Sequence, residues 1–311
     1  MSQPSSIELR DSYAVQEQGA KVQEEIEEYR KNKKEYWNFE TVQGIFKQAA
    51  EDTDPVSFNY LNEHFGKVGS WEQVFERLDQ LNKASKPNEC YKIFFLARHG
   101  EGFHNVANAK YGTKEWNEYW SKVNGDAEIT WGPDAELTEV GRLQAKANNE
   151  QWKVELKHGC RLASKWFVSP FSRSIDTFDI TWNDIIDLEK VKPVITEEVR
   201  ETIGIHTCDM RSSRSVIAKK FSSKGFVFEP DFAEEDIYFD KNNRETAVEQ
   251  AMRLNNFFQK VFELDEDVIN ITSHSGTIRV ILLIIGHRVF PVGTGGMIPV
   301  CVKGTKVEKK E

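Results

Sequence analysis

The sequence predicts an α/β fold in which helices cover both faces of a central, mostly parallel sheet. From residue 92 onward, apolar runs of strand length alternate with longer segments of helical period. This alternation is typical of parallel strands joined by crossover helices. Several of the strand-like runs lack polar alternation, as expected of strands that are buried on both faces. No internal repeat or low-complexity linker divides the 311 residues.

The expected strands are short and rich in aliphatic and aromatic residues. They cover residues 92–97, 165–169, 193–196, 267–273 and 297–302. Helices are expected between them, at 138–156, 174–188, 246–262 and 276–286. The third helix opens with a capping box, because Thr246 precedes Glu249 by three residues. Its predicted buried stripe consists of Ala247, Ala251, Leu254, Phe258 and Val261.

The first 88 residues have a different character. Residues 1–36 are polar and dense in charge, which favours a solvated helix or a partly disordered arm. Between 70 and 82, Ser70 and Gln73 have capping-box spacing and the apolar side chains share one helical face, which predicts a helix packed on the main domain. The expected division is an extension at 1–88 that packs on the core, followed by one domain at 89–311.

Composition and charge exclude several classes of protein. Hydrophobic residues make up 39% and charged residues 29%, and no apolar run reaches the ~18 residues that a membrane helix needs. A net charge of −9 argues against a general binder of nucleic acid or of anionic membranes. The amino terminus lacks the blocks of a secretory signal, so a cytoplasmic and also nuclear location is expected. The cysteines are far apart and are expected to be free thiols, neither disulfides nor a zinc site: Cys90, Cys160, Cys208 and Cys301.

Polar side chains follow four of the expected strands at the point where each strand ends. In open α/β sheets ligands bind beyond the carboxyl ends of the strands, so these side chains are expected to converge on one edge. In chain order they are Arg98, His99 and Gly100, then Arg173 in "SPFSR", Glu201 in "EEVRETIG" and His274 in "SHSG".

These residue types suit phosphoryl transfer without a metal or any other cofactor. A neutral imidazole can attack phosphorus and hold the phosphoryl group covalently. Arginines match the geometry of phosphate oxygens, and a carboxylic acid can protonate the leaving alkoxide and later take a proton from water. A helix that starts near Gly276 would point its amides at the anion. Three other histidines are interpreted as solvated or structural: His64, His158 and His287.

The motifs resemble those of the histidine phosphatase superfamily, also called phosphoglycerate mutase-like. "ARHGEGFHN" contains the Arg-His-Gly of that family with Asn105 five residues after the glycine. "LTEVGRLQA", "VSPFSRSIDT" and "TSHSGTIRV" match its later motifs in the same order. "WNEYW", "RETIGIHTCDMRSS" and "NRETAVEQAMR" are similar to the phosphomutase-like proteins of yeasts and plants.

The resemblance implies a three-layer α/β/α fold with a helical and loop cap, in which 89–311 is the catalytic domain. It implies that His99 is the phosphorylated nucleophile, that Glu201 is the acid and base, and that the phosphate pocket consists of Arg98, Asn105, Arg173 and His274. Glu197 and Glu198 compete with Glu201 for its role. Candidate substrate contacts, with structural roles as the alternative, are Gly102, His104, His206, Asp209 and Arg211. Gly102 stands where many members carry a hydroxyl residue.

The predicted function is a metal-independent phosphatase that hydrolyses small phosphomonoesters through a phosphohistidine on His99. The alternatives are a phosphomutase that transfers the group within a substrate, and a non-catalytic binding member of the family. The absence of a glycolytic-type "NERHYG" loop favours hydrolysis. The acidic, aromatic run at 228–240 is expected to belong to the cap. His99 must be neutral to attack, whereas His274 is expected to serve as a cation, which predicts a bell-shaped pH profile displaced to the acid side.

Overall fold

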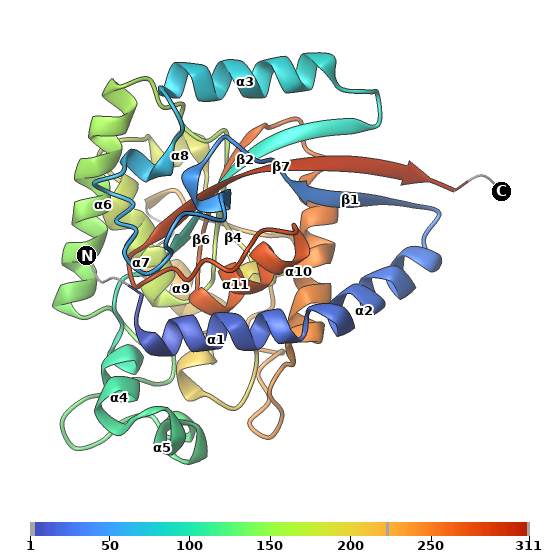
Figure 1. The fold of residues 1–311 in the computed structure, drawn as a ribbon. Helices are drawn as coiled ribbons and strands as arrows, with labels where there is room; N and C mark the ends of the chain where they lie inside the picture. The colour runs from blue at the N-terminus through green and yellow to red at the C-terminus, as the bar shows by residue number, and fades with distance from the viewer. Residues whose placement is uncertain (1–3, 222–223, 310–311) are drawn as a thin grey trace.

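The computed structural model describes residues 4–221 and 224–309, and in these residues seven strands form one sheet (Figure 1). The strand order is β1-β7-β2-β6-β3-β4-β5. In chain order the strands are β1 (Glu35–Thr41), β2 (Glu89–Arg98), β3 (Lys165–Val168), β4 (Val194–Ile195), β5 (Val227–Phe228), β6 (Val268–Ser273) and β7 (Met297–Glu308). Strands β2, β6, β3, β4 and β5 pair in parallel, and β7 is antiparallel to both of its neighbours.

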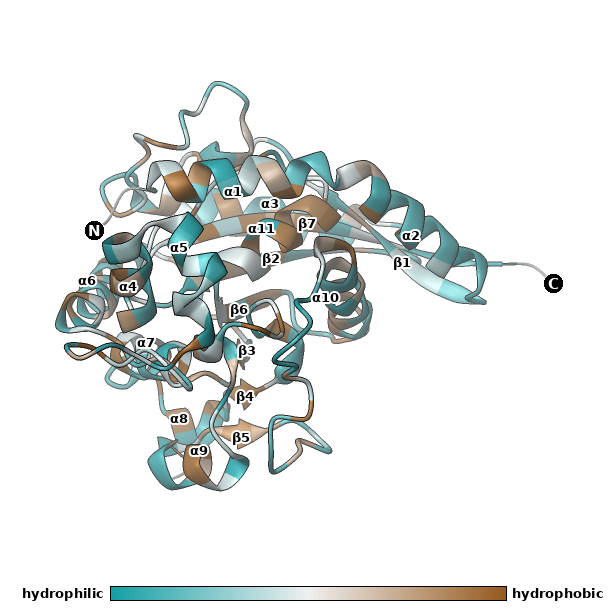
Figure 2. Cartoon of the chain, turned by 90° about the horizontal axis from the view of Figure 1, so that it is seen from below, coloured by the Kyte–Doolittle hydropathy of each residue, from teal (hydrophilic) through white to brown (hydrophobic). Residues whose placement is uncertain are grey.

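One face of the sheet is covered by four helices. They are α1 (Ser6–Glu17), α2 (Gly19–Lys31), α10 (Ala247–Val261) and α11 (Ser275–Ile284). Helix α11 is apolar around most of its circumference because it lies between the sheet and α1, as Figure 2 shows. The predicted stripe of α10 is buried from Ala251 to Val261 and packs on Phe94 of β2. This face therefore carries one continuous apolar core.

The other face is covered by a second group of helices. They are α3 (Trp71–Ala84), α6 (Glu139–Lys157), α7 (Ser172–Trp182), α8 (Leu188–Val191) and α9 (Arg214–Phe221). Its core is aromatic, with Trp152 of α6 packed against Phe95 of β2 and Trp182 of α7. The two helical layers around one sheet confirm the predicted three-layer α/β fold.

A cap of short helices lies beyond the carboxyl ends of the parallel strands. It contains α4 (Phe103–Tyr111), α5 (Thr113–Glu118) and the 3₁₀ turn η3 (Trp120–Lys122). Trp116 and Trp131 are buried in its own small apolar cluster. The remaining 3₁₀ turns are η1 (Lys47–Ala49), η2 (His64–Gly66), η4 (Glu197–Val199) and η5 (Thr207–Asp209).

Two predicted elements are shorter than the sequence pattern indicated. The helix expected at 174–188 ends at Trp182, and Asp184 just beyond it accepts a hydrogen bond from Asn149 of α6. The strand expected at 193–196 shrinks to two residues. Proline at 193 has no amide hydrogen for the ladder, and the Thr196 hydroxyl instead caps η4.

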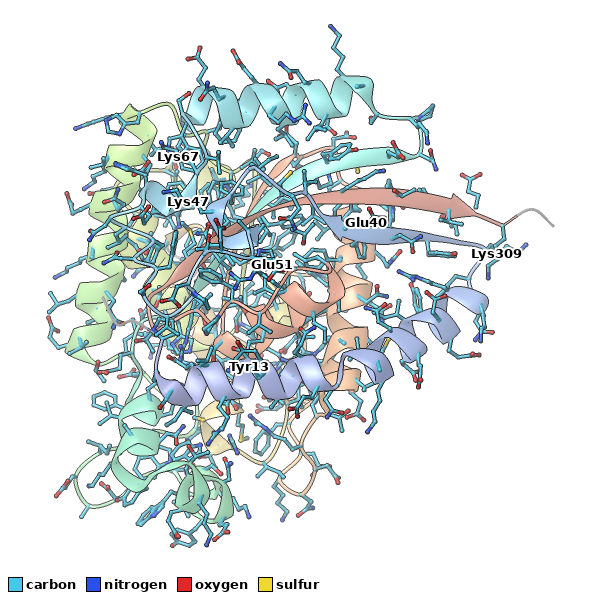
Figure 3. The ribbon with its side chains drawn as sticks, in the orientation of Figure 1. Tyr13, Glu40, Lys47, Glu51, Lys67 and Lys309 are labelled. Carbon is cyan, nitrogen blue, oxygen red and sulfur yellow. The ribbon has the colours of Figure 1, made fainter. Side chains whose placement is uncertain are left out.

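The amino-terminal segment is helical from Ser6 to Glu17 and from Gly19 to Lys31 and packs on α10 and α11, so the helix was the better of the two expectations and the partly disordered arm was wrong for these residues. Helix α1 begins with a capping box between Ser5 and Glu8, and α2 buries Val22 and Ile26. Strand β1 was missed altogether and pairs with β7 over its full length. The irregular segment 42–69 follows, on which Figure 3 labels Lys47, Glu51 and Lys67.

Two further expectations concern the chain as a whole. The four cysteines are free thiols, of which Cys90 is half-buried and the others are buried. Within the described ranges, no helix combines the length and the apolar character that crossing a bilayer would require.

Candidate active site

The register of the sheet brings the predicted site residues to one edge. Arg98 at the end of β2 is the register partner of Ser273 at the end of β6. Val168 at the end of β3 pairs with Thr272 of β6 and with Ile195 of β4. The residues that follow these ends therefore leave the sheet side by side, as the sequence predicted.

His99 is buried and held in a defined orientation. Its Nδ1–H donates to the carbonyl oxygen of Gly100 at 2.6 Å, which leaves Nε2 as the nitrogen with a lone pair. Burial, and then the charges of Arg173 and Arg98, lower the pKa of His99 well below 6.5. Gly100 is required here, because a side chain at this position would lie 2.3 Å from the carbonyl oxygen of Gly141 on α6. The imidazole is therefore neutral and fixed, as a nucleophile must be.

His274 lies behind His99, with 5.0 Å between the two ring centroids. The hydroxyls of Ser169 and Ser174 lie 2.6 Å and 3.3 Å from its Nε2, and each can donate to or accept from that nitrogen according to the ring tautomer. Burial, and then Arg173 and His99, lower the pKa of His274 well below its usual range. In the ligand-free protein the surroundings of His274 therefore disfavour the cation that the sequence analysis expected.

Arg173 is fully buried, and hydrogen bonds to Cys208 and Asp209 hold its guanidinium in place. Nη1 donates to the carbonyl oxygen of Cys208 at 2.7 Å and Nη2 to Asp209 at 2.9 Å. Its Nε has no hydrogen-bond partner among the described residues, and the same is true of Arg98 Nε and His274 Nδ1. Buried N–H groups are paired in the great majority of native structures. Three such nitrogen atoms lie on residues close to His99, where an anion with several oxygens would find partners.

Arg98 meets a carboxylate that the sequence did not reveal. Its Nη1 donates to the carbonyl oxygen of Val292 at 2.8 Å and to Glu8 of α1. The backbone amide of Ser5 holds the other oxygen of Glu8 at 2.7 Å, so this side chain serves the capping box and the site together. Burial alone would raise the pKa of Glu8, but the charge and hydrogen bond of Arg98 outweigh it and lower the pKa.

A cavity of about 400 Å³ lies beside these groups. Arg98 and His99 line it, whereas Arg173 and His274 are fully buried and are not among its lining residues. Helix α1 forms one wall and helices α4 and α5 form another, on the near side of the sheet in Figure 2. The other predicted site residues in the lining are His104, Asn105, Glu201, His206 and Asp209. The sequence reasoning missed five charged lining residues, which are Glu8, Arg10, Asp11, Arg244 and Arg279.

Glu201 is placed at the amino terminus of α11. Its Oε1 accepts from the amide of Thr202 at 2.9 Å and its Oε2 from the amide of Gly276 at 3.2 Å. The neighbouring Arg200 is buried, and Asp236 receives two of its N–H groups at 2.8 and 2.6 Å. None of the residues 228–240 lines the cavity, and that this run belongs to the cap stays a prediction. The run contributes Asp236, which pairs with Arg200 together with Glu197.

Gly102 contacts both His104 and Asn105. The amide of Gly102 donates to Asn105 Oδ1 at 2.9 Å, which caps α4. A side chain at 102 would lie 2.7 Å from His104 Nδ1. His104 therefore takes the space that a hydroxyl residue at 102 would need, and its ring lies 5.3 Å from that of His99. Gly102 itself offers no side chain to a substrate.

Asp209 joins two arginines at the rear of the cavity. Its second oxygen accepts from Arg244 at 2.9 Å. Burial would raise the pKa of Asp209, but Arg244 and Arg173 outweigh it and lower the pKa. The donor atoms of His206, Cys208 and Asp209 lie within 4.8 Å of one another. This set does not fit a metal ion, because the carboxylate is already shared by two cations and burial keeps the Cys208 thiol protonated by raising its pKa.

Arg211 has the structural role that the sequence analysis kept as the alternative to a substrate contact. Its Nε donates to Glu197 at 2.5 Å, and its two Nη atoms donate to the backbone carbonyl oxygens of Ser212, Ala233, Glu234 and Glu235. Glu197 is engaged by Arg200 as well, so it cannot replace Glu201 as the acid.

Comparison with known proteins agrees with this geometry. The family description "Histidine phosphatase superfamily (branch 1)" matches residues 94–289. The chain belongs to the histidine phosphatase superfamily. A probable phosphoglycerate mutase of Arthroderma benhamiae is 37% identical over 86% of this chain and 84% of its own length. Phosphomutase-like protein 3 of Candida albicans is 36% identical over 75% and 69%. A solved mycobacterial glucosyl-3-phosphoglycerate phosphatase covers 68% of this chain and 90% of its own, with 17% identity and a TM-score of 0.40.

The superfamily match covers only part of the fold. It begins inside β2 and ends after α11, so α1, α2, β1 and α3 lie outside it. Arg98, His99, Arg173 and His274 lie within the matched range, and Glu8 lies outside it.

Proposed function

We propose that this protein is a metal-independent phosphatase that hydrolyses small phosphomonoesters through a phosphohistidine on His99. The observation that supports it best is the set of three buried nitrogen atoms without a partner in the described residues, on Arg98, Arg173 and His274, around a His99 whose pKa is lowered. A phosphoryl group would accept from all three while its phosphorus faces Nε2 of the imidazole. Membership of a superfamily of phosphatases and mutases supports the same chemistry.

The reaction would proceed in two balanced steps. Nε2 of His99 attacks phosphorus, the bond from phosphorus to the ester oxygen breaks, and Glu201 gives its proton to the departing alkoxide. Water then attacks the phosphohistidine, Glu201 takes one of its protons, and the phosphorus–nitrogen bond breaks to release inorganic phosphate. The amides of Thr202 and Gly276 keep Glu201 in place through both steps.

A mutase is the second candidate, and the names of the fungal relatives favour it. Both reactions share the phosphohistidine and differ in whether water or a substrate hydroxyl receives the phosphoryl group. A bisphosphorylated metabolite separates them. The phosphatase releases one phosphate per turnover, whereas a mutase returns a positional isomer without release.

The test of the nucleophile is His99→Asn, with His287→Asn as the matched control. His287 is a buried histidine outside the cavity, and its Nδ1 contacts a backbone carbonyl as His99 does. We expect His99→Asn to lose turnover of a generic aryl phosphate and to lose an acid-labile phosphoryl label trapped by rapid quenching. The control should keep both, with or without a chelator. Turnover in His99→Asn, or loss of turnover on chelation in the parent protein, would contradict the proposal.

A further inference from the structure

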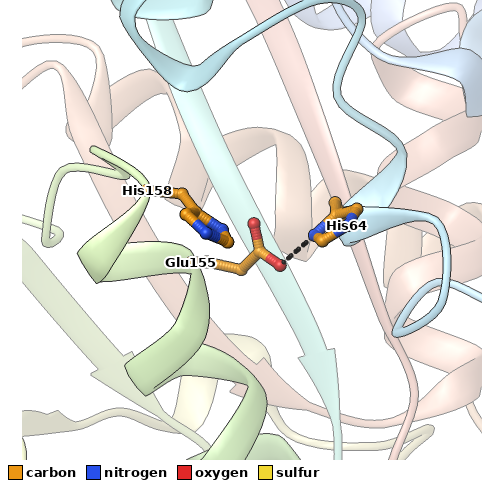
Figure 4. Close-up of side chains that lie close together, drawn as sticks. All are labelled: His64, Glu155 and His158. Carbon is orange, nitrogen blue, oxygen red and sulfur yellow. Dashed lines mark hydrogen bonds and ion pairs between the residues drawn. The ribbon is translucent and has the colours of Figure 1, made fainter.

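Three potential metal ligands meet at the carboxyl end of α6, away from the end of that helix that lies beside the catalytic cavity. Glu155 lies in the last turn of α6, and His158 caps the end of that helix three residues later. His64 comes from η2 in the segment 42–69. Figure 4 shows the Glu155 carboxylate between the two imidazole rings, and the donor atoms of the three residues all lie within 4.8 Å of one another.

The negative charge of the Glu155 carboxylate is not balanced by a permanently charged partner in the described residues. Glu155 is fully buried, and its oxygens accept from His64 Nδ1 at 2.8 Å, Trp71 Nε1 at 2.7 Å and Gln151 Nε2 at 2.5 Å. In residues 4–221 and 224–309, no lysine or arginine forms an ion pair with it, and His64 is its sole basic partner. A buried carboxylate normally has a cationic partner or binds a metal. An ion held by Glu155 would supply the missing charge.

The types of ligand atom in this cluster indicate which metal ion it would bind. Two imidazole nitrogens and one carboxylate oxygen form a ligand set that zinc accepts, with water as a fourth ligand. Magnesium and calcium prefer all-oxygen sites. The two histidines are exposed, so an ion can enter from solvent, while Trp71 and Gln151 orient the carboxylate from within.

The backbone at His64 gives a second indication. His64 and Phe65 both have left-handed backbone angles, with φ of 49° and 61°. Non-glycine residues in this region are strained, and such residues gather at ligand clamps and functional sites. Phe65 is fully buried against Trp71 and Trp152, which anchors the turn and presents the His64 ring to α6.

We propose that His64, Glu155 and His158 bind a zinc ion that fastens the segment 42–69 to the end of α6. The site is separate from the phosphoryl chemistry. Gly141 packs against Glu101 beside the cavity, and Glu155 lies fourteen residues further along the same helix. At 1.5 Å per residue this is about 21 Å. The role of the ion is structural, and the inference stands whether or not the proposed hydrolysis is correct.

The test uses the full chain after chelator treatment. We expect calorimetric titration with ZnCl₂ to show one tight site per chain, with no competition from MgCl₂, and a rise in the thermal midpoint. Cobalt should give a tetrahedral absorption spectrum. Glu155→Gln and His158→Ala should each weaken zinc binding more than about 100-fold, because even outer-shell partners are worth roughly 10–100-fold. Glu150→Gln, an exposed glutamate on the same helix, should bind as the parent does.

His158→Ala keeps the test decisive if Glu155→Gln fails to fold, because His158 is exposed at the surface. Unchanged affinity in His158→Ala would overturn the proposal, as would a parent protein that takes up no zinc. A cobalt spectrum that survives in the His64→Ala, His158→Ala double variant would place the ion among the cavity histidines and would also overturn it.

Discussion

The substitution Gly276→Ala should move the proposed proton donor without unfolding the protein. Gly276 lies in the first turn of α11, where its backbone is helical and its amide donates to Glu201. A methyl group at this position would lie 2.1 Å from Glu201 Oε1 and 3.0 Å from its carboxyl carbon. Ordinary contact begins at 3.4 Å, so the carboxylate must shift by more than about 1 Å.

The magnitude follows from that displacement. A misplacement of about 1 Å in a catalytic group can lower the rate about 10²-fold. Alanine is favoured over glycine within a helix by roughly 0.5–1 kcal/mol, so the fold should be as stable as before or slightly more stable. The loss should therefore appear in catalysis and not in the free energy of unfolding.

The assay compares two substrates that need the proton to different degrees. For an alkyl phosphate the leaving alkoxide needs a proton, and we expect kcat/KM for phosphate release to fall about 10²-fold. For an aryl phosphate with an acidic phenol as leaving group, kcat/KM should stay within about threefold, because that phenolate can leave unprotonated. Gly19→Ala is the matched control, since a methyl group at this position on α2 meets Leu283 at an ordinary 3.4 Å.

Equal losses for both substrates would refute the assignment of Glu201 as the proton donor. An unchanged alkyl phosphatase activity would refute it as well. A fall in the thermal midpoint of Gly276→Ala would show that the methyl group displaced backbone, contrary to the steric reasoning above.

Three further predictions follow from the same geometry. Glu8→Gln keeps an acceptor for Arg98 but removes a negative charge from the proposed phosphate pocket. KM for a phosphomonoester should therefore fall about tenfold, which corresponds to about 1.4 kcal/mol of binding free energy. A raised KM would show instead that the charge of Glu8 positions Arg98. Asp236→Asn neutralises one of the two carboxylates that pair with buried Arg200, the other being Glu197, and should lower the free energy of unfolding in urea by roughly 3 kcal/mol, the lower end of the range for a broken buried pair. The exposed Glu235→Gln should not change it. Burial lowers the pKa of both His206 and His287 from 6.5 to about 4, and the charge of Arg244 adds to the effect at His206. Between these pH values the unfolded chain binds protons at the two histidines that the folded chain does not bind. Their contribution to stability is therefore present above pH 6.5 and is lost as the pH falls toward 4. Between pH 7 and pH 5 each of the two histidines should lower the free energy of unfolding by about 2 kcal/mol, and a flat urea midpoint over this range would contradict the shifted values.

The catalytic half of the fold was predictable because its signals are local. Each parallel strand is a buried apolar run that ends in polar residues, and each helix shows its own periodicity or cap, as at Thr246 and Glu249. Strand β1 was missed because its neighbourhood is dense in charge. Its alternation of Trp37 and Phe39 with polar residues was the available signal, since these two side chains are the buried ones. That strand is stabilised by pairing with β7, more than 250 residues away in the chain.

The sequence could place those site residues that directly follow a predicted strand. His99, Arg173 and His274 follow strands that the register aligns. The roles of the buried charges were not predictable, because a charge in the sequence does not reveal its partner. Arg211 and the acidic run at 228–240 resemble surface or cap residues in the sequence, yet they form an internal network with Glu197 and Arg200. The neutrality of His274 likewise depends on burial and on Arg173, which only the packed structure shows.

The amino-terminal segment lies outside the superfamily match but contributes to both sites described above. Segments outside the superfamily match contribute Glu8 to the phosphate pocket and His64 to the cluster on α6. Glu8 is fixed by the first turn of α1, and α1 is held against α11, which itself begins beside the second histidine. A movement of α1 would therefore change the charge beside Arg98 and the packing of the helix that positions Glu201. Because α1 lines the cavity, we expect a variant that loosens this helix to change KM for a phosphomonoester more than it changes kcat.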